Sequence, residues 1–339
     1  MARGRATIAA IAQEVGVSVP TVSRVLNGRS DVAESTRLRV EAALVRHDYR
    51  KPVGSKPLLR SEGLIDLVFH EVGNAWAQEI ITGVERAAAP EHIGVVLSQL
   101  GGSHRPPQES LDAIMARRSL GVLLVLSGLD AAQRQQLDAR SIPYVVVDTD
   151  GETPPGVPTV GSNNWNGGLV ATRHLLGLGH TRIAVISGPP DVLCSRARVD
   201  GFKSAHDEAG VVVDPSFVRW GNFESPSGYR NAKELLERRD RPTAVFAGSD
   251  SQALGVLRAA RELGIRVPED LSVVGYDDLP VSAWLTPPLT TVRQPLAEMA
   301  SLATRMLLGL SRGDVLTTPR IELGTELVIR ETSAPPADA

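Results

Sequence analysis

The fold of the amino-terminal part is decided by residues 7–27, which read TIAAIAQEVGVSVPTVSRVLN. Apolar residues recur there at helical spacing up to Val15, and the following Gly16 is of the type that ends a helix. Ser18 can cap a second helix, and Pro20 suits its first turn, where a backbone N–H is not needed. We therefore expect two short helices joined by a glycine-containing turn, which form a helix-turn-helix.

A further apolar stripe predicts a third helix from about Ser35 to His47, which would complete a three-helix headpiece. In the second helix, Val22 and Val25 face one side, while the other side carries short polar side chains and Arg24. A helix-turn-helix places its second helix in the major groove of DNA. A short polar surface with one long cation suits phosphates and base edges, so this surface predicts contact with DNA.

The charge distribution separates this headpiece from the rest of the chain. Residues 1–60 hold 11 basic and 5 acidic residues, and the resulting +6 leaves −9 on the remainder of a chain whose net charge is −3. A basic headpiece on an acidic body predicts a polyanionic partner for the headpiece alone. The charge by itself would fit a solvated basic surface equally well, and it is the helical pattern that favours DNA.

Residues 7–27, together with Thr36-Arg37 and Asp48-Tyr49-Arg50, resemble the headpiece of the lactose/galactose repressor (LacI/GalR) family of bacterial regulators. The resemblance implies a transcription regulator that binds operator DNA. It implies base-reading positions at Val19, Pro20 and Arg24, and phosphate contacts at Ser18, Thr21, Ser23 and Asn27. Val19 and Pro20 have no polar side-chain atoms, so Arg24, which can make two hydrogen bonds to a guanine, is the expected base reader.

Residues 51–61, which read KPVGSKPLLRS, are rich in Pro, Gly and Ser and predict a linker. The family resemblance implies that this segment forms a hinge helix on operator DNA and inserts Leu58 or Leu59 into the minor groove, which kinks the duplex. Pro57 opposes such a helix, because proline in a helix interior costs about 3 kcal/mol relative to alanine. From the sequence, both outcomes for the hinge stay open.

From Leu64 onward, apolar runs of strand length alternate with segments of helical length. The predicted strands are Leu64–Phe69, Ile93–Ser98, Gly121–Leu126, Pro143–Val147, Arg182–Ser187, Thr243–Ala247 and Leu271–Tyr276. This pattern predicts parallel α/β sheets covered by helices on both faces, and the grouping of the strands predicts two doubly wound lobes.

The predicted domains are the headpiece at residues 1–50, the linker at 51–61, the core at 62–331 and a flexible tail at 332–339. Within the core, we expect the first lobe at about 62–160 and 289–320. The second lobe is expected at about 161–288 and 321–331.

Ligands of doubly wound folds bind beyond the carboxyl ends of the strands. Polar and aromatic residues follow the predicted strands there, and from them we expect a site that contains Asn74, Trp76, Ser127, Asp148 and Trp165. Aromatic rings stack on the apolar faces of sugars, and Asp, Asn and Arg side chains bind adjacent hydroxyls. All four Trp lie at or just beyond predicted strand ends, which favours a sugar, although packing would explain any one of them.

The core also carries segments that resemble the sensor core of the same family, which is itself similar to periplasmic sugar-binding proteins. These segments are GHTRIA at 179–184, RVDGF at 198–202, VVGYDD at 273–278 and PLTTVRQ at 288–294. The resemblance implies that Arg198, Phe223, Ser249 and Asp277 line the effector site. It implies that Gln294 lies near that site on a strand that crosses between the lobes.

Enzyme motifs are missing from the sequence, which has no Gly-x-Ser-x-Gly elbow and no P-loop. Only Gly177-Leu178-Gly179 matches part of a dinucleotide-binding fingerprint, and it lacks the third glycine. We therefore predict that the chain is not an enzyme and needs no cofactor or metal. The single cysteine, Cys194, excludes an internal disulfide and is expected to be a bystander thiol.

The expected partners follow from these assignments. No apolar run is long enough to cross a bilayer and no signal peptide is recognisable, so we expect a cytoplasmic protein without membrane contact. The last residues carry no heptad pattern, so we expect a twofold homodimer and a near-palindromic operator. We predict a repressor of carbohydrate-use genes that a sugar or oligosaccharide releases; the alternative is a corepressor such as a purine or another small metabolite.

Overall fold

The computed structural model describes residues 8–26, 32–47, 63–101, 104–149, 151 and 153–337. The chain divides into two compact units, Met1–Arg60 and Ser61–Ala339, which are described separately. Asn27, Leu58 and Leu59, and with them the predicted hinge helix, lie outside the described residues. None of the described helices is both long enough and apolar enough to cross a membrane.

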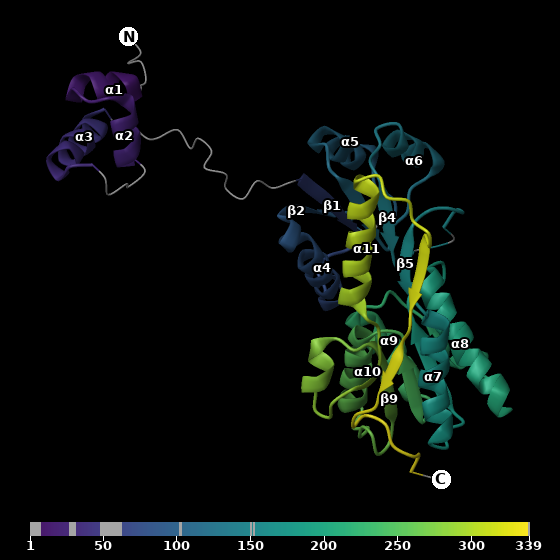
Figure 1. Cartoon of the computed structure of the whole chain (residues 1–339). Coiled ribbons are helices and arrows are strands. Elements are labelled where there is room, and N and C mark those ends of the chain that lie inside the picture. Colours follow the sequence, from purple (N-terminus) through teal and green to yellow (C-terminus); the bar gives the residue numbers. More distant parts are fainter. Residues whose placement is uncertain are drawn as a thin grey trace. The chain divides into compact units, whose positions relative to one another are not determined.

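In the described part of the first unit, three helices pack around a small apolar core (Figure 1): α1 (Ile8–Val15), α2 (Val19–Leu26) and α3 (Glu34–Arg46). Each helix contributes to that core, which holds Ile11, Ala12, Val22, Val25, Val40 and Ala43. Gly16 has a φ of 68°. In that left-handed region a side chain is strained, so glycine suits the turn between α1 and α2. The predicted helix-turn-helix is confirmed.

The second unit begins with a lobe built on a parallel sheet of strand order β11-β5-β4-β3-β1-β2. In Figure 1, α11 lies beside α4 over this sheet. Alternate residues of a strand face opposite sides, so Leu67 and Leu123 pack with α4 and α11, while Val68 and Leu124 pack with α5 and α6. The elements of this lobe are β1 (Gly63–Phe69), α4 (Ala75–Ala88), η1 (Ala89–Glu91), β2 (Ile93–Gln99), α5 (Gln108–Arg117), β3 (Gly121–Val125), α6 (Ala131–Asp138), β4 (Tyr144–Val147), β5 (Thr159–Ser162), α11 (Leu296–Ser311) and β11 (Arg320–Leu323).

The other lobe has a sheet of strand order β12-β10-β9-β8-β6-β7, in which only β12 pairs antiparallel among the described strands. Helices α7 and α8 cover one face, and α9 and α10 cover the other. Its elements are α7 (Asn164–Gly177), β6 (Ile183–Ser187), α8 (Leu193–Ala209), η2 (Pro215–Phe217), β7 (Val218–Trp220), α9 (Ser225–Leu236), β8 (Ala244–Ala247), α10 (Asp250–Glu262), β9 (Ser272–Asp277), η3 (Pro280–Trp284), β10 (Thr290–Arg293) and β12 (Glu326–Val328). The predicted fold of two doubly wound lobes is confirmed.

Within residues 153–337 the chain crosses between the lobes three times: between β5 and α7, between β10 and α11, and between β11 and β12. The sequence assignment placed residues 289–320 in the first lobe and 321–331 in the second. The structure corrects both limits, because β10 pairs with β9 in the second sheet and β11 pairs with β5 in the first. These short strands carry no signal of which sheet they join.

The segment after Arg330 also differs from the expected flexible tail. Thr332 is fully buried, and its hydroxyl donates to the carbonyl of Val273 at 2.7 Å and accepts from the backbone N–H of Thr290 at 2.8 Å. The carbonyl of Ala334 lies 2.9 Å from Nε2 of His180. Residues 332–334 therefore pack against the second lobe.

Candidate functional site

A cavity of about 190 Å³ lies at the carboxyl ends of the strands of both sheets, where the two lobes face each other. The first lobe lines it with residues at or just beyond the carboxyl ends of β1, β2, β3 and β4, and the second lobe with residues at or beyond those of β6, β7, β8 and β9. The polar and aromatic lining includes His70, Glu71, Asn74, Trp76, His104, Asp148, Arg198, Asn222, Phe223, Glu224, Ser249, Ser251 and Asp277.

Arg198 is the only Arg or Lys among the described residues that line the cavity, and its side chain is fixed in place. The residue is only 3% exposed. Its Nε donates to Asn164 Oδ1 at 2.8 Å, and its Nη1 donates to the carbonyl of Gly248. The guanidinium lies 3.8 Å from the ring centroid of Tyr276. With these groups holding one side of the guanidinium, the cavity has a preorganised hydrogen-bond donor.

Two carboxylates, Asp148 and Asp277, line the cavity near this guanidinium and are almost completely buried. Burial raises the pKa of both carboxyls, and the charge of Arg198 opposes that rise. Gln294 Nε2 donates to Asp277 Oδ1 at 2.6 Å. A ligand that donates hydrogen bonds to these oxygens would stabilise their charged form.

Backbone strain is concentrated at the same cavity. Leu126, Asp148, Phe223 and Asp277 all line it, and their φ angles are 46°, 51°, 65° and 114°. Each such residue costs on the order of 1–3 kcal/mol and persists only where the surroundings hold it. Phe223 is held in part by Gly188, because the Phe223 ring occupies the space that a Cβ at that position would need.

Several lining residues are additional to those predicted from the sequence, among them His70, His104, Glu71 and Glu224. The rings of His70 and His104 stack with centroids 4.0 Å apart, and His104 Nδ1 lies 2.8 Å from the carbonyl oxygen of Leu126. The pKa of Glu224 is raised first by burial and then by the charge of Glu71 across the cavity, while a hydrogen bond with Asn74 opposes the rise. His70 directly follows β1, so the strand-end rule could have found it.

The sequence-predicted effector residues fall into two groups. Asn74, Trp76, Asp148, Arg198, Phe223, Ser249 and Asp277 all line the cavity. Ser127 does not, since it is fully buried and its hydroxyl donates to the carbonyl of Val125. Gln294 contacts Asp277 from behind instead of lining the cavity.

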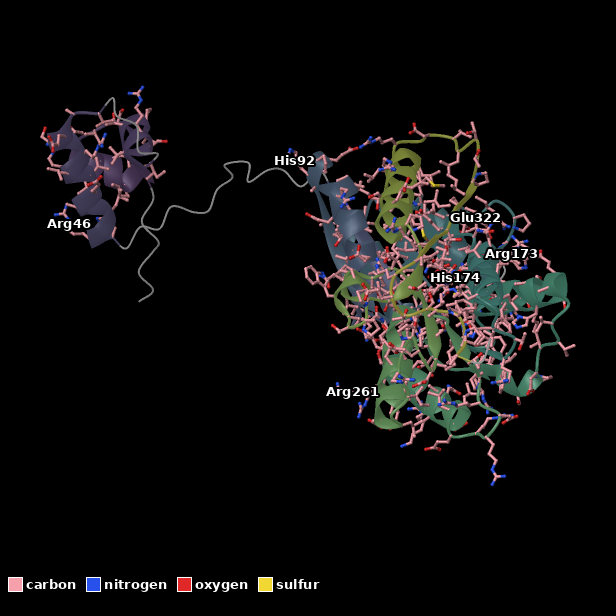
Figure 2. The ribbon with its side chains drawn as sticks, turned by 90° about the horizontal axis from the view of Figure 1, so that it is seen from below. Arg46, His92, Arg173, His174, Arg261 and Glu322 are labelled. Atoms are coloured by element: carbon pink, nitrogen blue, oxygen red, sulfur yellow. The ribbon has the colours of Figure 1, made fainter. Side chains whose placement is uncertain are left out.

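Trp165 lies elsewhere, in a larger cavity of about 730 Å³ that it shares with Arg320 and Glu322. Of these residues, Figure 2 labels Glu322. Asp148 and Cys194 line both cavities and so form a common wall. Burial raises the pKa of the Cys194 thiol to about 12, which leaves it a neutral packing group. Trp220 and Trp284 are 36% and 86% exposed and line neither cavity. Of the four Trp that the sequence places near strand ends, only Trp76 therefore lines the cavity with Arg198.

On the headpiece, the sequence-predicted DNA contacts that lie in the described residues share one surface of α2 and its preceding turn. Ser18, Val19, Pro20 and Arg24 are exposed, and Thr21 and Ser23 are half-buried. Ser18 Oγ and Thr21 Oγ1 lie 2.9 Å apart. No group of three His, Cys, Asp or Glu among the described residues is arranged to hold a metal ion.

Comparison with known proteins covers both units. Residues 7–51 match the family of bacterial regulatory proteins of the lacI type, and residues 172–333 match a periplasmic binding protein-like domain. The HTH-type transcriptional repressor PurR of Vibrio vulnificus is 32% identical over 329 residues, which are 96% of this chain and 98% of that protein. The ribose operon repressor of Escherichia coli K12 is 32% identical over 334 residues, which are 97% of this chain and all of that protein.

Among solved structures, a complex of the transcriptional regulator CelR with cellobiose superposes with a TM-score of 0.70 and 34% identity, and covers 97% of this chain and 100% of that one. These relatives are transcriptional repressors or regulators and not enzymes. With an identity above 30% over nearly its full length, the chain belongs to the LacI family and is a DNA-binding transcriptional repressor.

Proposed function

We propose that the cavity binds a neutral sugar or short oligosaccharide and that this effector releases the repressor from the operator of carbohydrate-use genes. The observation that carries the proposal is the charge of the cavity. Arg198 is its one described cation, and four carboxyl groups face the same space: Glu71, Asp148, Glu224 and Asp277.

With one guanidinium and four carboxyl groups, this lining offers an anionic ligand such as a sugar phosphate or a nucleotide too little positive charge to replace its hydration in a poorly solvated site. Sugar hydroxyls can donate to carboxylates and accept from a guanidinium at the same time. The ring faces of Trp76 and Phe223 suit the apolar side of a pyranose or furanose. Relatives of the chain include the ribose operon repressor and CelR, which was solved with cellobiose.

On the DNA side, we propose that α2 enters the major groove with Arg24 on base edges and Ser18, Thr21 and Ser23 on phosphates. Val19 and Pro20 would contact thymine methyls or exclude other bases. A homodimer would present two such helices, which matches a near-palindromic operator whose half-sites lie about one helical turn or a multiple apart.

The second candidate is a nucleobase or another neutral metabolite that acts as a corepressor. Flat aromatic surfaces and carboxylates also suit a purine ring with its N–H donors. Identity to the PurR repressors equals identity to the ribose operon repressor, so similarity does not favour either effector.

The test is a thermal-shift screen of the full-length protein against cellobiose, D-ribose, D-galactose, hypoxanthine, guanine and D-ribose 5-phosphate. A compound at 100 times its Kd stabilises the folded protein by about 2.7 kcal/mol. We expect a sugar to raise the Tm and the phosphate to leave it unchanged. Stabilisation by a nucleobase alone would establish the second candidate, and stabilisation by D-ribose 5-phosphate would contradict the charge argument.

A gel-shift titration then shows whether the effector is an inducer or a corepressor. The DNA is a duplex that the full-length protein selects from a random library. An inducer weakens the protein–DNA complex, and a corepressor strengthens it. Because coupling is reciprocal, the duplex must change the affinity for the sugar by the same factor.

A further inference from the structure

The carboxyl end of β9 contacts the segments that cross between the lobes, through two adjacent aspartates. Asp277 lines the cavity, whereas Asp278 does not. Both have left-handed backbone angles, with φ of 114° and 57°. Both side chains contact residues at the crossing between β10 and α11, Gln294 for Asp277 and Arg293 for Asp278, and through them they connect the cavity wall with the joints between the lobes.

Asp277 is connected to the crossing between β5 and α7 through the side chain of Gln294. Gln294, which lies in the crossing between β10 and α11, donates to Asp277 Oδ1 at 2.6 Å. Ser162, the last residue of β5, donates through its hydroxyl to Gln294 Oε1 at 2.5 Å. All three side chains are buried, so a carboxylate of the second lobe is linked to a hydroxyl of the first without intervening solvent.

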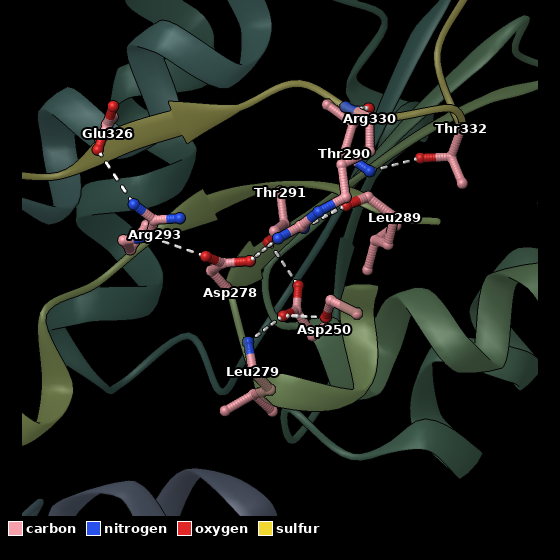
Figure 3. Close-up of polar contacts among 11 residues, drawn as sticks. Asp250, Asp278, Leu279, Leu289, Thr290, Thr291, Arg293, Glu326, Arg330 and Thr332 are labelled. Carbon is pink, nitrogen blue, oxygen red and sulfur yellow. Dashed lines mark hydrogen bonds and ion pairs between the residues drawn. The ribbon is translucent and has the colours of Figure 1, made fainter. Parts of the chain in front are cut away.

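Asp278 binds two arginines that lie near the crossing between β10 and α11 and the crossing between β11 and β12 (Figure 3). Its Oδ2 accepts from Arg293 Nε at 2.8 Å, and Arg293 directly precedes the crossing to α11. Its Oδ1 accepts from Arg330 Nη2 at 2.6 Å, just beyond β12. Arg293 Nη1 also lies 3.4 Å from Glu326 Oε2, on the first residue after the third crossing.

The turn that contains Asp277 and Asp278 is also held by the buried carboxylate of Asp250. Asp250 Oδ2 accepts from the backbone N–H of Leu279 at 2.7 Å, and its Oδ1 accepts from Thr291 Oγ1 at 2.5 Å. Gly275 admits this carboxylate, because a Cβ there would collide with Asp250 Oδ1. The turn is therefore held in one strained arrangement, and a displacement of Asp277 has to move Asp278 with it.

We propose that Asp278 is a positioning residue that transmits the state of the effector cavity to the crossing segments, so that a ligand at Asp277 changes the angle between the lobes. This inference rests on the proposed function only in placing the effector at Asp277. Closure of two lobes about a few chain crossings is a general way in which ligand binding is converted into domain motion.

The test compares Asp278→Asn with Asp270→Asn in the full-length protein. Both changes remove one carboxylate charge of the second lobe with little change in shape. Asp270 pairs with Arg266 instead, and among the described residues it has no recorded hydrogen bond or ion pair with a crossing segment, so it serves as the matched control. Arg293→Gln is the second variant, because it breaks the same contact from the other side and does not alter the strained turn.

The first measurement needs no effector. Hydrogen exchange is followed in peptides that span residues 162–164, 294–296 and 323–326, and in α5 as an internal reference. We expect exchange at 294–296 and 323–326 to be about 3- to 30-fold faster in Asp278→Asn, and α5 to stay unchanged. Unchanged exchange at these crossings, or equal acceleration in Asp270→Asn, overturns the proposal.

The second measurement separates a positioning role from a merely structural one. Calorimetry with cellobiose or D-ribose gives the sugar affinity, and a gel shift with and without that sugar gives the coupling factor. We expect Asp278→Asn and Arg293→Gln to change sugar affinity less than about threefold and to reduce the coupling factor by about 3- to 30-fold. A coupling factor equal to that of the wild type overturns the proposal. If neither sugar binds the wild-type protein, the choice of effector fails, and hydrogen exchange alone decides the role of Asp278.

Discussion

The surface of α2 and the cavity of the core are built in opposite ways. On α2, the side chains expected to contact DNA come from one run, Ser18 to Arg24, and most of them are exposed. The cavity takes its lining from segments as far apart as Phe69 and Asp277, and its charged groups include an arginine and two aspartates that are almost completely buried. An exposed charge is screened by water, whereas a buried one depends on its fixed partners.

This difference predicts that single substitutions cost more in the cavity than on α2. The largest effect is expected for Arg198→Ala, because it leaves Asp148 and Asp277 without their cation. A hydrogen bond to a charged group contributes about 1.5–3 kcal/mol, and a ligand oxygen left without its partner in a buried site costs about 1–3 kcal/mol more. Calorimetry with the sugar that binds the wild-type protein measures the loss.

The matched variant Arg198→Lys keeps the charge but loses the hydrogen bond from Nε to Asn164. We expect it to recover part of the affinity, and we expect DNA binding without sugar to be kept in both variants. Wild-type sugar affinity in Arg198→Ala would show that the effector binds elsewhere.

A smaller loss is expected on α2. Arg24→Ala should reduce binding to the selected duplex by about 1–3 kcal/mol and relax the preference at one base pair, because a bidentate contact to guanine is lost. Thr21→Ala is the comparison, since loss of a phosphate contact weakens binding to all sequences alike. Competition gel shifts with selected and random duplexes measure both. Equal losses on the two duplexes in Arg24→Ala would make Arg24 a phosphate contact.

The third prediction separates the two Trp residues that the sequence analysis grouped together. Trp76→Ala should weaken sugar binding by about 0.5–1.5 kcal/mol, the usual contribution of an aromatic contact. Trp165→Ala should leave sugar affinity unchanged, because Trp165 lines the other cavity. A loss in Trp165→Ala as large as that in Trp76→Ala would mean that the effector extends past Asp148 and Cys194.

The smallest effect is a dependence on pH. Burial raises the pKa of Asp148 and Asp277 above the ordinary value of 3.8, so between that pH and the raised values the folded, empty core binds more protons than the unfolded chain. The associated stability is complete at low pH and is lost as the pH rises through the raised values. Sugar hydroxyls that donate to the carboxylates favour the charged form, so binding should release protons and strengthen with rising pH.

Calorimetry in phosphate and in Tris buffer measures this proton release, which we expect to be less than about one proton per protomer. Asp277→Asn should reduce it. Heats of binding that are independent of the buffer would show that the aspartates do not change protonation when the sugar binds.

The elements that could be predicted from the sequence are those whose structure depends on residues close together in the chain. The helix-turn-helix depends on contacts over a few residues, such as the turn at Gly16 and the apolar spacing of Ile11 and Val22, and it was predictable element by element. The strands of both sheets were also recognisable, because buried parallel strands are continuous apolar runs. The short strands β5, β7, β10, β11 and β12 were not predicted, since their place in a sheet depends on pairing with other strands.

For the cavity, the strand-end rule and the family resemblance together placed most of the polar lining, but they could not distinguish a residue that faces the cavity from one that faces away. Ser127 follows β3, yet its hydroxyl donates to the carbonyl of Val125, whereas His104 and Glu224 lie several residues beyond the ends of β2 and β7 and still line the cavity. The direction of a side chain after a strand depends on the local backbone conformation. Asp148 and Phe223 have left-handed backbone conformations although neither residue is a glycine, so their sequence does not predict where their side chains point.

The sequence by itself determined the headpiece, the succession of strands and helices, and the polar character of the strand ends. Each of these depends on residues close together in the chain, where capping and apolar periodicity act. Only the tertiary structure decided that Trp76 and not Trp165 lines the cavity with Arg198, and that Asp277 reaches Ser162 through Gln294. Trp76 and Arg198, like Ser162 and Asp277, lie more than one hundred positions apart in the chain, and the geometry that joins them depends on how the two lobes pack.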